Sequence, residues 1–117
     1  MTKAIWNVSG MVFLLIVATP AFADAALEKA EGDYMLCVRR AAVRFEPSGE
    51  SPQDIATAAV WACVREGLPA MNLLLRDPNT SMTPVQLVSS AKQAAIGQVV
   101  GARLCRKNKD CDYASPN

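Results

Sequence analysis

The sequence predicts an all-α fold: a small disulfide-stapled bundle of three to four helices built on an N-terminal helical hairpin. Apolar residues recur at helical spacing along most of the chain, and no stretch alternates apolar with polar residues as a half-buried strand does. Proline and glycine clusters divide this pattern into segments. The chain also has four cysteines, an even number that allows complete pairing in disulfides: Cys37, Cys63, Cys105 and Cys111.

The N-terminus has the features of a cleavable export signal. Lys3 gives the N-terminal region its positive charge, and the run from Met11 to Ala18 is almost purely apolar. The Ala21-Phe22-Ala23 sequence then fits the small-x-small pattern at which signal peptides are cleaved. The apolar run is shorter than the ~20 residues that a transmembrane helix needs. We therefore expect residues 1–23 to be a signal peptide, with an uncleaved anchor as the alternative. Residues 24–117 are expected to form a single domain of 117 − 23 = 94 residues in the periplasm or outside the cell.

The mature domain is expected to carry no net charge. The chain has 12 basic and 11 acidic residues, and loss of Lys3 leaves 11 of each. A neutral chain has no general attraction for nucleic acid or for an anionic membrane, so neither is expected as a partner. Acids gather near the start of the domain and bases near its end, which favours helix-dipole complementarity over a docking patch.

The first helix is expected over residues 24–45. Its apolar face is formed by residues at i, i+3, i+4, i+7 and i+11: Tyr34, Cys37, Val38, Ala41 and Phe45. Glu46 precedes a proline, which pushes it out of the α region, and the helix is expected to end there.

The second helix is expected to begin after Ser51, which serves as its N-cap, with a proline directly following and Asp54 at N3. From Ala56 to Val64 only one residue is polar, so we expect this helix to be buried at the centre of the fold. Gly67 and Pro69 are expected to end it.

Two further helices are expected beyond that point. A short one covers residues 68–76, and a long one begins at Thr83 after a turn over residues 77–81. The domain is expected to close with a short polar tail from residue 108, which carries Cys111.

Hairpin geometry predicts that Cys37 pairs with Cys63. At 1.5 Å per residue, Cys37 lies about 12 Å from the turn along the first helix and Cys63 about 16 Å along the second. The short connection makes the helices antiparallel, so the two cysteines end nearly level. Cys105 is then left to pair with Cys111 across a polar link that can reverse the chain. The alternative is a bridge from Cys105 or Cys111 to the hairpin.

The two arms of the hairpin also carry a recognisable pattern: Tyr34-x-x-Cys37-Val38, Ala41-Ala42-Val43 and Ile55-Ala56-x-Ala58-Ala59-x-Trp61-x-Cys63. It resembles small exported helical proteins of Gram-negative bacteria that are themselves uncharacterised. The resemblance implies a disulfide-stapled hairpin and carries no function. The general plan is also similar to that of periplasmic acid-stress chaperones.

The residue inventory argues against an enzyme. The chain has no histidine, which excludes Ser-His-Asp and Cys-His catalysis, and it has no nucleotide-binding glycine motif or Cys-x-x-Cys pair. The cysteine spacing does not fit a zinc site. Carboxylate-based catalysis is left open, with Glu66 expected to be a solvated residue at a helix end. We therefore expect no catalytic residue, no cofactor and no bound metal.

Two features indicate a possible interaction surface. Trp61 is a type of residue enriched at binding hot spots, although a place in the core is the expectation we favour for it. The second feature is an apolar cluster that one helix face cannot bury completely: Met71, Leu73, Leu74 and Leu75. We expect at least one of these leucines to be exposed.

The leading hypothesis is a non-enzymatic periplasmic or secreted protein that acts by protein–protein interaction, as an inhibitor, immunity or accessory factor. The alternative is a periplasmic acid-stress holdase chaperone. Because the chain has no histidine, an acid switch would depend on carboxylates, whose pKa values lie near ~4.

Overall fold

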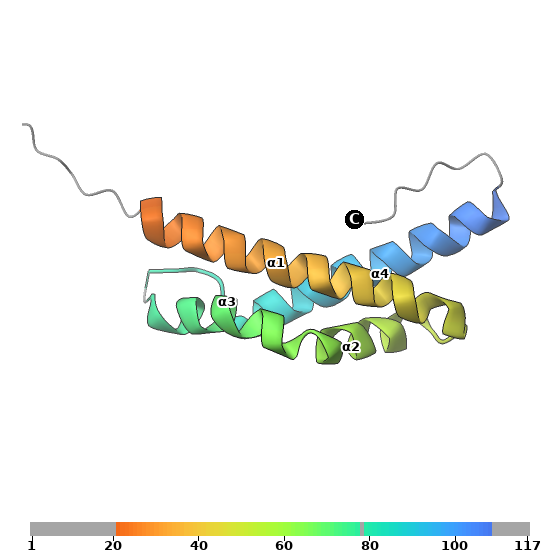
Figure 1. Ribbon diagram of the computed structural model, residues 1–117, viewed down its shortest axis with the longest axis horizontal. Helices are drawn as coiled ribbons and strands as arrows, with labels where there is room; N and C mark the ends of the chain where they lie inside the picture. Colours follow the sequence, from red (N-terminus) through yellow and green to blue (C-terminus); the bar gives the residue numbers. More distant parts are fainter. Residues whose placement is uncertain (1–20, 78, 109–117) are drawn as a thin grey trace, which may run out of the picture.

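The computed structural model describes residues 21–77 and 79–108 and confirms the all-α class (Figure 1). Its elements are α1 (Ala21–Phe45), the short 3₁₀ helix η1 (Glu46–Ser48), α2 (Pro52–Ala62), α3 (Val64–Arg76) and α4 (Pro84–Lys107). Residues 1–20, which make up most of the expected signal peptide, and Cys111 with the tail from residue 109 lie outside the described residues.

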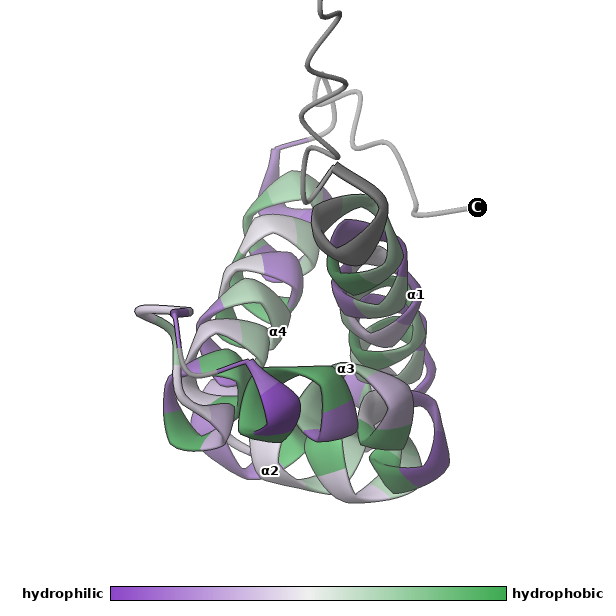
Figure 2. Cartoon of the chain, turned by 90° about the vertical axis from the view of Figure 1, so that its left-hand side faces the viewer, coloured by the Kyte–Doolittle hydropathy of each residue, from purple (hydrophilic) through white to green (hydrophobic). Residues whose placement is uncertain are grey.

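Three rods build the bundle. In Figure 1, α4 passes behind α1, and α2 and α3 follow one another as one bent rod; Figure 2 shows that this rod forms the base beneath α1 and α4. Helix α1 packs against α2, α3 and α4, while α4 packs mainly against α1 and α2. Among the described residues, no helix is long and apolar enough to cross a membrane.

The predicted helix starts are confirmed at two caps. The Ser51 hydroxyl accepts a hydrogen bond of 3.1 Å from the backbone N–H of Asp54. At the start of α4, Thr83 and Gln86 form a reciprocal capping box, with bonds of 3.2 Å and 2.8 Å. Both caps satisfy N–H groups that a helix start leaves unpaired.

The end of the second helix was predicted wrongly. Helix α2 ends at Ala62, and Cys63 has φ −108° and ψ 19°, outside the helical range. A new helix, α3, starts at Val64 and includes both Gly67 and Pro69. Gly67 therefore has a packing role, since a Cβ there would lie 3.0 Å from Cε2 of Tyr34.

The expectation that the second helix is the buried centre of the fold was also wrong. Only one side of α2 is covered, and Ala58 and Ala62 are exposed. The buried apolar residues come from all four helices: Tyr34, Val38, Ala41, Ala42, Ile55, Ala56, Ala59, Cys63, Ala70, Leu74, Leu87, Ala91, Ala95 and Val99. Half of them are alanines, whose small side chains let the helices approach closely. Alanines on the outer side of α2 expose little apolar surface, so leaving them uncovered costs little free energy.

We expect Gly67→Ala to lower the free energy of unfolding. Its new methyl group overpacks the ring of the fully buried Tyr34, at a cost of about 1–3 kcal/mol, which exceeds the gain of at most ~1 kcal/mol from helix propensity. Gly97→Ala in α4 is the matched control, because a Cβ at Gly97 meets nothing within 4 Å. The control should gain about 0.5–1 kcal/mol. Equal effects in urea unfolding would contradict the close approach of α3 to α1.

Tyr34 buries a hydroxyl that has no hydrogen-bond partner among the described residues. Burial raises the pKa of this hydroxyl above 10.0, because the core solvates a phenolate poorly. Since the pKa is raised on folding, the stability that depends on it is complete below the unfolded-state pKa of 10.0 and is lost as the pH rises through the folded-state value.

We therefore expect Tyr34→Phe to keep or increase the free energy of unfolding at neutral pH, by up to about 1 kcal/mol, because it removes an unpaired buried hydroxyl. Above about pH 10 the variant should lose less stability than the unmodified chain. Denaturant titrations at neutral and alkaline pH measure both effects. A loss of more than about 1 kcal/mol at neutral pH would show that the hydroxyl has a partner.

Candidate interaction surface

The structure separates the predicted surface residues. Trp61 and Leu75 are each 73 % exposed, whereas Leu74 is in the core at 4 %. Met71 and Leu73 are half-buried. The expectation that at least one of the leucines is exposed is confirmed, and the expectation of a buried tryptophan was wrong.

Trp61 is close in sequence to a buried disulfide, yet it is exposed. Cys63 is fully buried and bonded to Cys37 of α1. Trp61 lies on the exposed side of α2, together with Ala58 and Ala62.

The exposed tryptophan lies just before an apolar row on α3, which we call the α3 stripe: Val64, Leu68, Met71 and Leu75. Its spacings are 4, 3 and 4 residues, the repeat that places side chains along one side of a helix. Val64 and Leu68 are 42 % and 48 % exposed. Sequence reasoning missed these two residues because it ended the second helix at Gly67. The 4-3-4 spacing of Val64, Leu68, Met71 and Leu75 was the signal that could have found them.

Helix α3 has two apolar sides. Gly67, Ala70 and Leu74, spaced 3 and 4 residues apart, form the side that packs into the core. The α3 stripe lies on the neighbouring side. Met71 packs against the core, whereas contacts among the described residues leave Val64, Leu68 and Leu75 exposed.

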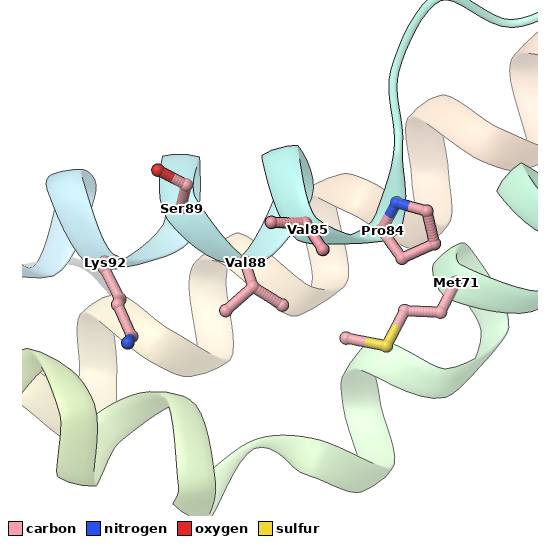
Figure 3. A pocket seen from close by; sticks show the side chains of 6 residues that line it. All are labelled: Met71, Pro84, Val85, Val88, Ser89 and Lys92. Atoms are coloured by element: carbon pink, nitrogen blue, oxygen red, sulfur yellow. The ribbon is translucent and has the colours of Figure 1, made fainter.

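A pocket of about 390 Å³ lies between α3 and the start of α4, next to the stripe. Figure 3 shows the Met71 side chain extending from α3 toward Val88 of α4, with Val85 beside it and Lys92 one turn further on. Val85 is itself 78 % exposed. The pocket widens the apolar surface from α3 onto α4.

Cationic side chains border this surface. Arg65 and Arg76 directly follow Val64 and Leu75 along α3, so both lie on the same flank of the stripe, and both are exposed. Lys92 lines the pocket on the opposite flank. The one acid of α3 is Glu66, which lies on the far side of the helix, beside the disulfide.

The disulfide between Cys37 and Cys63 confirms the hairpin pairing, with a Cα–Cα distance of 6.0 Å, typical for such a bridge. A bridge from Cys105 to the hairpin is thereby excluded. Cys105 is itself disulfide-bonded, and its expected partner, Cys111, lies outside the described residues.

Cys37, Cys63 and Glu66 bring three possible ligand atoms within 4.8 Å of one another. The two sulfurs are bonded to each other, and a metal needs thiolates. In this oxidised form the cluster is therefore a disulfide with a neighbouring carboxylate.

Sequence reasoning also missed a buried carboxylate at the end of the hairpin. Glu46 is 2 % exposed and forms ion pairs with Arg103 and Arg106 of α4. The Arg103 Nε lies 3.5 Å from Oε1, too far for a good hydrogen bond, while Arg106 bonds Oε2 directly. Arg103 also donates to the backbone carbonyl of Glu50. Arg103 and Arg106 thus hold α4 against the hairpin through these ion pairs, in addition to the helix-dipole role that was expected of them.

Comparison of the chain with protein-family models, curated proteins and solved structures found no match. The resemblance to small exported helical proteins stays a prediction. The candidate site therefore depends on the geometry of the chain itself, which presents an apolar, cation-bordered stripe on α3.

Proposed function

We propose that this protein is a non-enzymatic binding protein of the periplasm or extracellular space, which acts by docking another protein on the α3 stripe. The observation that carries the proposal is the exposure of Trp61 at the end of α2 and of Leu68 and Leu75 along one side of α3. The internal disulfide supports export, because disulfides persist mainly in oxidising compartments.

The energetics favour a covered stripe. Burying a large apolar side chain contributes about 1.5–3 kcal/mol relative to leaving it exposed. Tryptophan is enriched among the residues that dominate binding energies, and Trp61 lies just before the stripe along the chain. Contiguous exposed apolar surface bordered by polar residues is typical of protein interaction sites.

Affinity capture from the producing cells tests this proposal with three tagged chains. The unmodified chain should retain a specific protein, and Trp61→Ser with Leu75→Gln should lose it. Leu104→Gln is the matched control, because Leu104 is 61 % exposed at the other end of α4. This variant should retain the same protein.

Two results would count against the proposal: the stripe variant captures the same proteins as the unmodified chain, or the unmodified chain captures nothing above background. Circular dichroism of each variant checks that the helices are intact. Because the substituted side chains are already exposed, we expect no change in helix content.

The acid-stress holdase is the alternative function, since an exposed apolar stripe could also hold unfolded chains. It predicts that near-UV circular dichroism and dye binding change as carboxylates titrate near ~pH 4. A protein unchanged on acidification through that range would rule out this alternative.

A further inference from the structure

We propose that the docking segment of the partner is a single amphipathic helix whose apolar seam is bordered by acidic side chains. This inference rests on the proposed function, because it names the kind of protein surface that the α3 stripe fits. Three features support it: the spacing of the stripe, the pocket beside it and the charges that border it.

The spacing of the stripe fits a helix. Residues at 4-3-4 spacing occupy the a and d positions of a heptad repeat, which pack as knobs into the holes of a facing helix. Residues 64–75 of α3 extend over about 17 Å at 1.5 Å per residue, about three turns of a partner helix. The pocket formed by Met71, Val85 and Val88 offers a hole for one large apolar side chain of that helix.

The charges on both flanks select an acidic partner. Arg65 and Arg76 lie on one flank and Lys92 on the other, whereas Glu66 points to the opposite side of α3. Carboxylates on both borders of the partner's seam would face these cations. Complementary charge of this kind steers association and fixes the register of the two helices.

A second copy of this chain fits less well. Two stripes packed face to face would bring together four arginines, Arg65 and Arg76 from each copy, and α3 supplies no acid on that side to pair with them. Like charges placed together across an interface disfavour association.

A membrane surface also fits less well. Helices that lie on anionic lipid present a broad apolar face, whereas a strict a/d row is the narrower seam of helix–helix packing.

Calorimetric titration of the oxidised full-length chain with three synthetic peptides tests the inference. Each peptide is about three heptads long. The first has leucine at a and d and glutamate at the bordering positions, the second has lysine in place of glutamate, and the third is a scrambled form of the first. Like charges along the borders keep the first two peptides from self-association.

We expect the acidic peptide to bind at least about tenfold more tightly than the lysine peptide, and the scrambled peptide to bind no better than the lysine peptide. Arg65→Gln with Arg76→Gln should remove most of that preference, and Leu68→Gln should abolish binding. Leu104→Gln should leave binding unchanged, since Leu104 lies outside the stripe.

Equal binding of the acidic and lysine peptides, or absence of binding by the acidic one, would overturn the inference. Binding to phosphatidylglycerol vesicles with no binding of the acidic peptide would identify a lipid surface instead. Capture of a protein that depends on the stripe, without recognition of the acidic peptide, would refute this inference and leave the proposed function standing.

Discussion

Replacement of Cys37 and Cys63 by alanine is expected to lower the free energy of unfolding by about 3–4 kcal/mol. The bridge joins residues 26 positions apart, and cross-linking a loop of that length removes about this much chain entropy from the unfolded state. It also fixes the junction between α2 and α3, since Cys63 is the residue at which the rod bends.

Urea unfolding of the double variant measures this loss. The matched control is Cys105→Ala with Cys111→Ala, where the expected bridge closes a loop only 111 − 105 = 6 residues long. The entropy of so short a loop is smaller, so the control should lose less stability. Equal losses, or a loss below about 1 kcal/mol for the hairpin bridge, would contradict its assigned role.

Replacement of both Arg103 and Arg106 by glutamine is expected to cost about 3 kcal/mol or more, a larger loss than Glu46→Gln produces. The double variant leaves the carboxylate of Glu46, 2 % exposed, without a counter-charge. Glu46→Gln instead leaves two arginines whose side chains are 30 % and 61 % exposed and can turn to water. We expect this single change to cost about 1–2 kcal/mol.

The surface pair of Lys29 and Asp33 is the control for these changes. Its atoms lie 3.0 Å apart, but the side chains are 80 % and 62 % exposed. Lys29→Gln should therefore change the unfolding free energy by less than about 0.5 kcal/mol. If Glu46→Gln proved more costly than the double arginine variant, burial of an unpaired carboxylate would not be the main cause of the lost stability.

The parts of the fold that the sequence predicted are those fixed by local chemistry. Ser51 and Thr83 cap their helices because each hydroxyl accepts a hydrogen bond from a backbone N–H only three residues later. Such a bond can form without any residue distant in the sequence. The pairing of Cys37 with Cys63 could be predicted because both cysteines lie at similar distances from a short turn that joins two antiparallel helices.

The parts that were missed depend on distant residues. A glycine is typical of a helix end, yet Gly67 lies inside α3, where its lack of a side chain lets the ring of Tyr34 pack closely. Glu46 looked like a residue at a helix end beside a proline, and its burial follows from Arg103 and Arg106, 57 and 60 positions away along the chain (103 − 46 and 106 − 46).

Only part of the candidate site was predicted, because the rest depends on contacts between residues distant in the sequence. Trp61 and Leu75 were identified by residue type, whereas Val64 and Leu68 depend on the direction in which α3 turns after Cys63. The direction changes at Cys63, which is bonded to Cys37 of α1, a tertiary contact. Leu74 was included in the surface because three consecutive leucines do not reveal which of them faces the core.

Site-specific photo-cross-linking in the producing cells tests most directly whether the α3 stripe is covered by another protein. A photoreactive amino acid replaces Leu68 in one chain and Leu104, 61 % exposed and outside the stripe, in another. We predict one discrete adduct with a second protein from position 68 and none from position 104. The same adduct from both positions, or no adduct from position 68, would contradict a covered stripe.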